Sequence, residues 1–293
     1  MYRNSHLQRF EGDNFFIEAF IDPFNKRVRI DDYRGNLAEV INKAEQFAAE
    51  TDAEKLIIKS RKEDCKELLN SCYVLEAVID RYFLGSDSYL FSKFFCKERM
   101  AADDWLNEDQ IIKGISKIGL AEGPPPMPGG YTLKKADTSA AELLASLYRQ
   151  VFEVYPTPLH DPGYVKKTIN EGTVYFAIYH EEKIVSAASA EVNHFYKNAE
   201  MTDCATLKDH RKHGLMKVLL LKLEEELLKD GIFHAYTLAR ALSFGMNAAF
   251  KQLGYSYTGR MLKNCFIYDK LEDMNVWTKN LTAKIIAEKP AHS

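Results

Sequence analysis

Residues 119–130 limit the possible fold more than any other part of the sequence. Their sequence, GLAEGPPPMPGG, contains four prolines and four glycines. Proline has no backbone N–H to give to a helix or a central strand, and glycine in the interior weakens both. The stretch therefore predicts an interdomain linker. We expect residues 1–118 and 131–281 to fold as two α/β domains and residues 282–293 to form a C-terminal tail.

The charge of the chain is nearly balanced, with 39 basic and 42 acidic residues and a formal net charge of −3. Such a balance offers no general attraction for nucleic acid or for an anionic membrane, so neither is expected as a partner. Any site for an anion must therefore be local. At 293 residues, of which 46% are hydrophobic, the chain is long enough to bury a core in each of two domains.

Three further features favour the cytoplasm. The first residues, MYRNSHLQRFEGDN, lack the apolar core of a signal peptide. The most leucine-rich stretch, VLLLKLEEELL, contains charges long before it could span a bilayer. The five cysteines are odd in number and show no CxxC spacing, which is typical of a reducing compartment. We therefore expect a cytoplasmic protein without a membrane segment.

Hydrophobic periodicity after the linker predicts a mixed α/β (α+β) fold. Leu219, Leu220 and Leu223 lie on one side of a helix, whereas period-2 runs predict strands. The expected order over residues 131–280 is β-α-α-β-β-β-α-β-α-β-β. The expected strands are 131–136, 173–179, 183–192, 199–207, 233–239, 256–262 and 265–271, and the expected helices begin near residues 139, 161, 214 and 243.

Three side chains that are basic or carry an imidazole precede the leucine-rich helix: Arg211, Lys212 and His213, followed by Gly214. A helix N-terminus already carries partial positive charge, so cations there are unfavourable unless an anion compensates them. The first amide N–H groups of a helix have no intrahelical partner, and a glycine lets a phosphate oxygen approach the backbone. The loop therefore predicts a pyrophosphate site.

The loop Arg211-x-x-Gly214-x-Met216, together with NAAFKQLGY from Asn247 to Tyr255, resembles the GNAT superfamily of acyl-CoA N-acyltransferases over about half the chain. Met216 stands where the family has a small residue. The resemblance implies acetyl-CoA as the cofactor, with its pyrophosphate on the loop amides. No G-x-G-x-x-G follows a predicted strand, which argues against a Rossmann fold. The residues implied in cofactor binding are Ala205, Thr206, Leu207, Arg211, Lys212, His213, Gly214, Leu215, Met216, Asn247 and Phe250.

The acceptor amine needs help to lose its proton. A lysine-type amine has a pKa of about 10.4, so deprotonation at pH 7 costs on the order of 4 to 5 kcal/mol. The resemblance implies a glutamate base eleven residues before the loop, which is Glu200, and Asp203 is the alternative. The period of a strand puts these two side chains on opposite faces unless a bulge intervenes, so only one is expected to face the substrate.

Other catalytic roles are less defined by the sequence. Phe250 occupies the position where many GNAT members have a tyrosine acid, and Tyr255 or Tyr257 would be substitutes without motif support. Backbone N–H groups of residues 205–207 are expected to stabilise the oxyanion. Cys204 lacks a histidine pattern that would activate it. His210 and His213 lie three residues apart without a third ligand nearby, so no metal is expected.

The stretches VFEVYPTPLHDPGYV and EMTDCATL resemble the β-lysine N-acetyltransferases, which acetylate the ε-amine of β-lysine to make an osmolyte. This resemblance implies a small-molecule amine acceptor, with Glu153, Tyr155 and Asp161 lining its pocket. Glu153, Asp161 and Asp203 could pair with the ammonium that does not react, and Arg240 with the carboxylate. A protein lysine or an aminoglycoside as acceptor and a non-catalytic acyl-CoA-binding regulator remain alternatives.

Residues 15–95 read as β-β-α-β-α-β-β, the order of the later part of the second domain. A repeat would align Arg34 with Arg211 and Tyr73 with Tyr255, and coincidence between two α/β patterns is the alternative. The loop Arg34-Gly35-Asn36-Leu37 lacks the glycine three places after the arginine. We therefore expect a degenerate copy that binds no cofactor and that packs on the catalytic domain or forms a homodimer.

Overall fold

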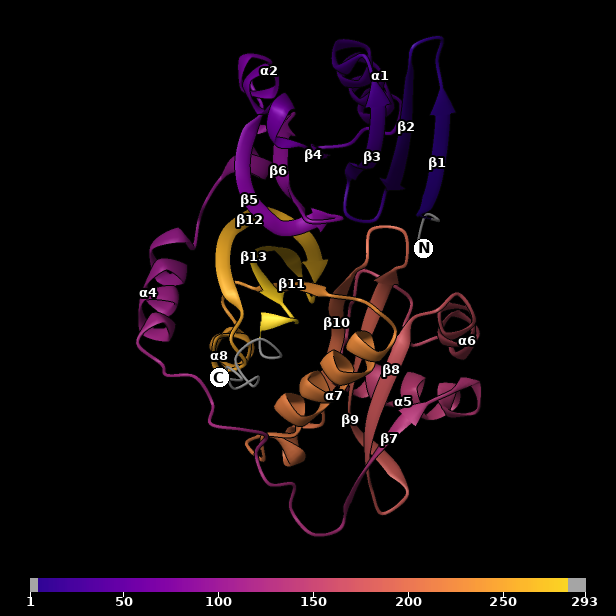
Figure 1. The fold of residues 1–293 in the computed structure, drawn as a ribbon, viewed down its shortest axis with the longest axis vertical. Helices are drawn as coiled ribbons and strands as arrows, with labels where there is room; N and C mark the ends of the chain where they lie inside the picture. Colours follow the sequence, from indigo (N-terminus) through magenta and orange to yellow (C-terminus); the bar gives the residue numbers. More distant parts are fainter. Residues whose placement is uncertain (1–4, 284–293) are drawn as a thin grey trace, which may run out of the picture.

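The computed structural model describes residues 5–283, which form a six-stranded and a seven-stranded sheet. Figure 1 shows the N-terminal sheet above the C-terminal one. The strand order of the N-terminal sheet is β1-β2-β3-β4-β6-β5. Its elements are β1 (His6–Glu11), β2 (Phe15–Asp22), β3 (Arg27–Gly35), α1 (Leu37–Glu50), β4 (Lys55–Ser60), α2 (Cys65–Asn70), β5 (Val74–Phe83) and β6 (Ser86–Phe94), followed by α3 (Lys97–Met100) and α4 (Trp105–Ser116).

The C-terminal sheet has the order β12-β13-β11-β10-β9-β8-β7. Its elements are β7 (Tyr131–Ala136), α5 (Ala141–Val151), α6 (Pro162–Asn170), β8 (Val174–His180), β9 (Lys183–Asn193), β10 (Asn198–Thr206), α7 (Leu215–Lys229), β11 (His234–Arg240), α8 (Phe244–Gln252), β12 (Ser256–Ile267) and β13 (Lys270–Asn280). The sequence predicted this order of elements and the mixed α/β class, and both are confirmed.

The bounds of the last two strands were wrong. The sequence predicted strands 256–262 and 265–271, but β12 is continuous and β13 begins at Lys270. The pairing of β12 with β13 shifts register between Tyr257 and Gly259 and between Met261 and Cys265. Because a bulge interrupts the period-2 alternation, one bent strand resembles two short ones in the sequence. The sequence analysis also missed β1, α3 and α4.

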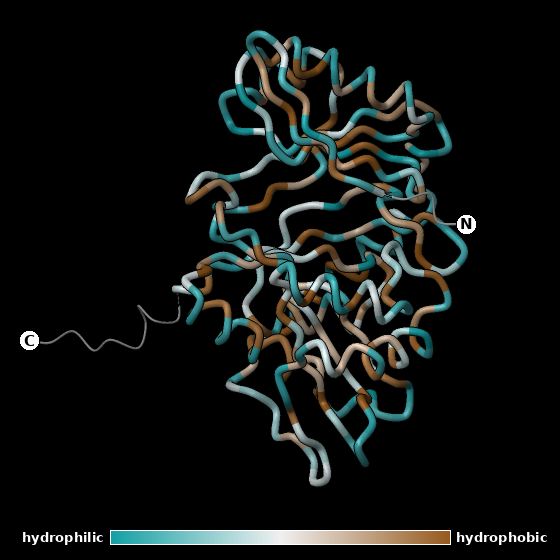
Figure 2. Tube along the Cα trace, turned by 90° about the vertical axis from the view of Figure 1, so that its right-hand side faces the viewer, coloured by the Kyte–Doolittle hydropathy of each residue, from teal (hydrophilic) through white to brown (hydrophobic). Residues whose placement is uncertain are grey.

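The N-terminal sheet packs one hydrophobic core, the C-terminal sheet packs two, and a further core joins the two sheets. Leu219, Leu220 and Leu223 of α7 are fully buried against the C-terminal sheet, which stabilises the fold by about 1.5–3 kcal/mol for each side chain. Helix α1 covers one face of the N-terminal sheet. The opposite face packs Ile57 and its neighbours against Tyr236 and other residues of the C-terminal sheet. Figure 2 shows hydrophobic segments inside both layers and hydrophilic ones at the loops.

The N-terminal sheet repeats the strand order of β8 to β13. In both, the third and fourth strands are parallel neighbours joined by a helix, and a second helix leads to the final antiparallel pair. The register shifts of β5 with β6, between Leu75 and Ala77 and between Ile79 and Phe83, each fall 182 residues before those of β12 with β13. An internal repeat predicts such a correspondence in fine detail, whereas a chance similarity does not.

A trio of side chains recurs at corresponding places. Lys93 Nζ donates to Glu45 Oε1 at 2.7 Å, and the Tyr73 hydroxyl donates to the same oxygen at 3.1 Å. In the C-terminal half, Lys279 Nζ donates to Glu224 Oε2 at 2.6 Å and lies 5.2 Å from the centre of the Tyr255 ring. Tyr73 and Tyr255 are the pair that the expected repeat aligns.

The two halves meet through reciprocal contacts. Arg27 at the start of β3 donates from Nη1 to the Asn264 carbonyl at 2.9 Å. Asn198 at the start of β10 donates from Nδ2 to the Tyr82 carbonyl at 2.7 Å. Both acceptors lie in the bulged part of the fifth strand of the opposite half, as a two-fold symmetric interface requires. Gly259 permits the close approach, because an added Cβ would lie 2.3 Å from the Glu76 carbonyl oxygen.

Residues 119–130 form neither a helix nor a strand. Ala121 N donates to the Gln252 carbonyl at 2.8 Å, and Pro125 lies beside Gly214 at the start of α7. We propose that this stretch links two domains, 1–118 and 131–281. Most of the expected tail, residues 284–293, lies outside the described residues. Within residues 5–283, helices of the length and hydrophobicity that a membrane span requires are absent.

Candidate active site

Strands β10 and β11 diverge in the middle of the C-terminal sheet. They pair only from Asn198 to Glu200, opposite His234 to Tyr236. Beyond this point the two strands are no longer paired by backbone hydrogen bonds. The Met201 carbonyl instead accepts a hydrogen bond of 2.6 Å from the Thr237 hydroxyl. A cavity of about 670 Å³ is lined by both strands, the start of α7, α8 and the end of β12.

The start of α7 forms one end of this cavity. Gly214 precedes the helix with φ of 71°, and among the described side chains none caps the helix. Arg211 and Lys212 are exposed and line the same cavity. Uncapped amides, the helix dipole and two cations favour an anion at this end. The pyrophosphate of acetyl-CoA fits this donor set.

The corresponding helix of the N-terminal sheet is closed to an anion. Asn36 caps α1, because its side chain accepts a hydrogen bond from Glu39 N. The Glu39 carboxylate lies in the first turn and accepts a hydrogen bond from Asn14 Nδ2 at 2.9 Å. A carboxylate at this position would repel a phosphate. The contrast between α1 and α7 supports the expectation that only the C-terminal half binds the cofactor.

Asp203 reaches the cavity because β10 bulges. The register with β9 shifts between Thr202 and Ala205, and Asp203 has φ of 52°, which is the left-handed region. Its Oδ2 accepts a hydrogen bond of 2.7 Å from Ser189 Oγ. The bulge that the sequence analysis left open is therefore present, and it turns Asp203 towards the cavity with Thr202 and Tyr155.

The Asp203 carboxylate is suited to accept a proton near neutral pH. Burial raises the pKa of Asp203 to about 6, although hydrogen bonds from Ser189 and Tyr155 lower it, and the negative charge of Glu200 adds to the increase. A base whose pKa lies just below the working pH is deprotonated and still accepts a proton effectively.

Glu200 lies one step away from the cavity. Glu200 is half-buried and lies opposite Glu191 in the register of β10 with β9. It does not belong to the cavity lining within the described residues. Desolvation raises the pKa of Glu191 to about 8, and the charges of Glu200 and Asp203 act in the same direction. Glu191 is a polar residue that sequence reasoning missed, because no motif marks it.

Cys204 also lines the cavity. Burial raises the pKa of its thiol, and the charge of Asp203 raises it further. A thiol with a raised pKa is a poor nucleophile, since the thiolate is the reactive form. The environment of Cys204 therefore argues against an acyl-cysteine mechanism.

Phe250 of α8 lines the cavity with a hydrophobic ring that has no proton to donate. Tyr255 packs edge to face on it with ring centres 5.1 Å apart, but its hydroxyl is directed to Glu224. Tyr268 lines the cavity as well and lies over Arg240, with the guanidinium 4.8 Å from the ring centre. No motif marks Tyr268, which lies in the turn after β12.

The side chain of Asn247 holds parts of the fold together. It was expected to contact the cofactor, but it is fully buried. Its Nδ2 donates to the carbonyls of Arg240 and Ser243, and its Oδ1 accepts from Asn275 and Trp277. All four hydrogen-bonding positions of the amide are thus occupied within the fold. Asn247 joins β11, α8 and β13 and has no position left for a ligand.

The predicted acceptor residues divide into two groups. Tyr155 and Arg240 line the cavity. Glu153 is exposed, and Asp161 caps α6 by accepting from Gly163 N at 2.8 Å. Neither belongs to the cavity lining within residues 5–283. The Asp-Pro pair before α6 is a capping signal, and in the structure the Asp161 side chain has this capping role.

Arg240 is already partly neutralised. Its Nη2 lies 2.6 Å from Glu272 Oε1, although its buried Nε lacks a partner among the described atoms. Of the expected cofactor residues, Thr206, Leu215 and Met216 line the cavity, whereas His213, Ala205 and Leu207 are absent from the described lining. The Leu207 N–H donates to the Val185 carbonyl at 2.9 Å, so it is not free to stabilise an oxyanion as expected.

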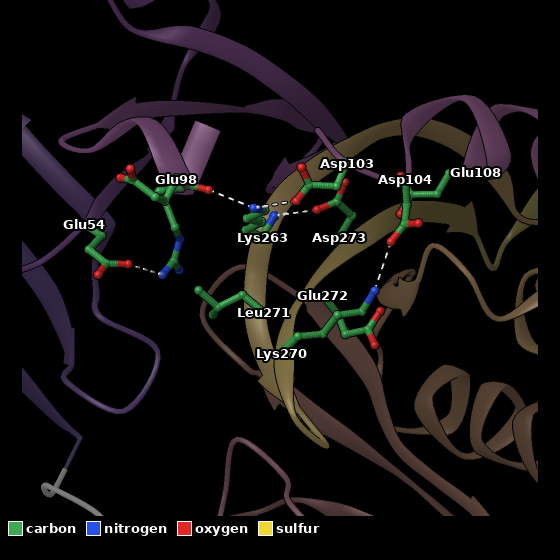
Figure 3. Close-up of a pocket in the computed structure, with 11 residues that line it drawn as sticks. Glu54, Glu98, Asp103, Asp104, Glu108, Lys263, Lys270, Leu271, Glu272 and Asp273 are labelled. Carbon is green, nitrogen blue, oxygen red and sulfur yellow. Dashed lines mark hydrogen bonds and ion pairs between the residues drawn. The ribbon is translucent and has the colours of Figure 1, made fainter. Parts of the chain in front are cut away.

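A second cavity of about 240 Å³ lies between the two halves (Figure 3). Seven carboxylates line it against three basic side chains, which makes it unsuitable for the polyanionic coenzyme A. Ion pairs such as Lys263 with Asp103 and Lys270 with Asp104 cross it. In the described part of the chain, neither cavity contains a group of three or more side chains placed to hold a metal ion.

Comparisons with known proteins agree with this geometry. The profile of the Acetyltransferase (GNAT) family matches residues 140–255. The chain is 38% identical to the N-acetyltransferase YodP of Bacillus subtilis, over 89% of this chain and 94% of that protein. It is 36% identical to the beta-lysine N(6)-acetyltransferase of Methanosarcina mazei, over 85% of this chain and all of that protein. It is 32% identical to the beta-lysine N(6)-acetyltransferase of Methanococcus maripaludis, over 88% of this chain and 94% of that protein.

Proposed function

Because the chain belongs to the GNAT family of acetyl-CoA-dependent N-acetyltransferases, we propose that it acetylates a small diamino acid at a primary amine, the ε-amine of β-lysine. The observation that carries the proposal is one cavity that joins an uncapped helix start to a buried carboxylate. Two relatives named as beta-lysine N(6)-acetyltransferases, which match both sheets, support the choice of acceptor.

The start of α7 holds the donor in this proposal. Amides of Gly214, Leu215 and Met216 would bind the pyrophosphate, with Arg211 and Lys212 beside it. Acetyl-CoA supplies the thioester from which the acetyl group is transferred. Its thiol has a pKa of about 8.5, so its departure needs less help than deprotonation of the amine. Phe250 is therefore compatible with turnover.

Asp203 acts on the acceptor. We propose that it takes the proton of the ammonium, because it lines the cavity whereas Glu200 is absent from the described lining. Tyr155 and Ser189 hold the Asp203 carboxylate in place. The partly apolar walls disfavour the charged ammonium and so lower its pKa, which makes the transfer of its proton to Asp203 easier.

Release of free thiol tests the proposed function. We expect the protein to release coenzyme A when acetyl-CoA and β-lysine are both present, at a rate well above that with spermidine, an aminoglycoside or a lysine-containing peptide. Mass spectrometry of the product should place the acetyl group on the ε-nitrogen. Faster turnover of another acceptor would replace β-lysine. Stabilisation by acetyl-CoA without thiol release from any amine would support the regulator instead.

A further inference from the structure

A cluster of charges lies where the two halves meet. It consists of Arg29, Asp31 and Lys59 from the N-terminal sheet and of Glu191 and Glu200 from the C-terminal sheet, and we call it the junction cluster. Arg29 and Asp31 alternate with the buried Val28 and Ile30, so they lie on the face of β3 opposite α1. The same face forms the core between the sheets.

The N-terminal members of the junction cluster hold one another in place. Arg29 Nε and Nη2 lie 2.6 and 2.9 Å from the two carboxylate oxygens of Asp31. Lys59 Nζ lies 2.8 Å from Asp31 Oδ1 and donates to the Tyr82 hydroxyl at 3.1 Å. This bonding fixes the orientation of the guanidinium and leaves its Nη1 outside the pair.

A short series of contacts leads from these cations to the carboxylates near the active site. The Tyr82 ring packs on that of Tyr236, with centres 5.8 Å apart. Tyr236 is the neighbour of Glu200 in the parallel pairing of β10 with β11. Glu200 in turn lies opposite Glu191, and Asp203 follows on the same strand. The glutamates of the junction cluster therefore lie on β9 and β10, three residues before Asp203 in the case of Glu200, and outside the described cavity lining.

Electrostatics agree with this proximity. Desolvation and the neighbouring carboxylates raise the pKa of Glu191. The positive charges of Arg29 and Lys59 lower it by a smaller amount. Desolvation lowers the pKa of Arg29, but Asp31 and then Glu200 raise it, and the net result is well above the usual value. The side chain of Arg29 is still 29% exposed, and Glu191 is exposed. A solute can therefore reach both side chains.

This pattern differs from a purely structural ion pair. Arg27, two residues before Arg29 on the same strand, is buried, and its guanidinium donates hydrogen bonds to the Asp22 carboxylate and to the Asn264 carbonyl. Arg29 is partly exposed, and its charge and those of Glu191 and Glu200 act on one another across the junction. A diamino acid carries two ammonium groups and one carboxylate, which complement two glutamates and one arginine.

We propose that the N-terminal half completes the acceptor site, with Arg29 binding the carboxylate of the acceptor and Glu191 with Glu200 binding the ammonium that does not react. This inference rests on the function proposed above. It gives the N-terminal half a direct role in selecting the substrate. In this assignment Arg29 binds the carboxylate, and Arg240, which lines the cavity and pairs with Glu272, is the alternative partner.

Two truncated acceptors and two variants test the assignment. 1,4-Diaminopentane is β-lysine without its carboxylate, and 6-aminohexanoate is β-lysine without its second amine. The wild-type protein should prefer β-lysine over both. Arg29→Met should lower kcat/KM for β-lysine by about 10- to 100-fold and leave that for 1,4-diaminopentane within about 2-fold. Glu191→Gln should lower kcat/KM for β-lysine and leave that for 6-aminohexanoate unchanged.

Arg9→Met is the matched control, because Arg9 also pairs with a carboxylate, Glu18, on the N-terminal sheet but is far more exposed. It should match the wild type with every acceptor. Equal losses for β-lysine and its truncated forms, or no loss, overturn the inference. If Arg29→Met does not fold, two other results test the inference: the acceptor preferences of Glu191→Gln, and the preference of the wild type for β-lysine over its two truncated forms. Absence of thiol release by the wild type would instead refute the proposed function.

Discussion

Asp203→Asn is expected to lower kcat by about 10²- to 10⁴-fold while acetyl-CoA binding stays near that of the wild type. Asparagine has nearly the same shape, but it cannot accept a proton from the ammonium. Its amide oxygen can still accept the hydrogen bond that Ser189 donates to Asp203. Steady-state kinetics of thiol release and calorimetric titration with coenzyme A measure the two quantities separately.

The pH dependence sharpens this prediction. The pKa of Asp203 is raised to about 6, so kcat/KM of the wild type should fall as the pH drops through 6 and the carboxylate takes up a proton. The residual activity of Asp203→Asn should lack this limb. Because the folded protein holds that proton more tightly than the unfolded chain, the ionised carboxylate destabilises the fold above pH 6. The variant should therefore melt at or above the wild-type temperature at pH 8.

Glu200→Gln is the matched comparison. We expect it to raise KM for the acceptor and to change kcat little, because Glu200 belongs to the junction cluster and is absent from the described cavity lining. A large loss of kcat in Glu200→Gln, together with an active Asp203→Asn, would contradict the assignment. In that case the base would be the residue that resemblance to the family implied.

Gly214→Val is expected to weaken coenzyme A binding by at least about 100-fold, measured by calorimetric titration. A Cβ at this position would lie 2.9 Å from Pro125 Cγ and would crowd the backbone where the pyrophosphate binds. Gly214 also has φ of 71°, where a side chain costs roughly 1–2 kcal/mol.

Gly231→Val separates these two effects. Gly231 follows the other end of α7 with φ of 70°, and no described atom lies within 4 Å of an added Cβ. The control shares the backbone strain but not the crowding, so it should lose stability and keep its affinity for coenzyme A. Equal affinities in Gly214→Val and the wild type would refute the assignment of the loop.

The sequence was informative wherever local patterns determine structure. The leucine spacing of α7, the glycine before it and the alternating strands predicted the order of elements in the C-terminal sheet. Local patterns do not reveal which polar groups are already occupied by hydrogen bonds within the protein. Asn247 matches a family position, but long-range bonds to Asn275 and Trp277 occupy it. Likewise, only the bulge after Thr202 decides where Asp203 lies.

The role of the N-terminal half could not be read from local patterns either. Arg29 and Glu191 lie far apart in the chain, and no motif links them. We propose that the half is a degenerate duplicate, based on the shared strand order and on the recurring trio of Tyr73, Glu45 and Lys93. Its reciprocal contacts with the C-terminal half resemble a dimer interface within one chain. This interface uses the surface that a homodimer of the same type would need.

A crystal structure of the protein with coenzyme A tests the central claim most directly. We predict one molecule in each chain, with its pyrophosphate within hydrogen-bonding distance of the backbone nitrogens of Leu215 and Met216 and its sulfur between β10 and β11. Coenzyme A bound beside Arg34 at α1, or in the acidic cavity between the halves with the start of α7 left free, would contradict the account.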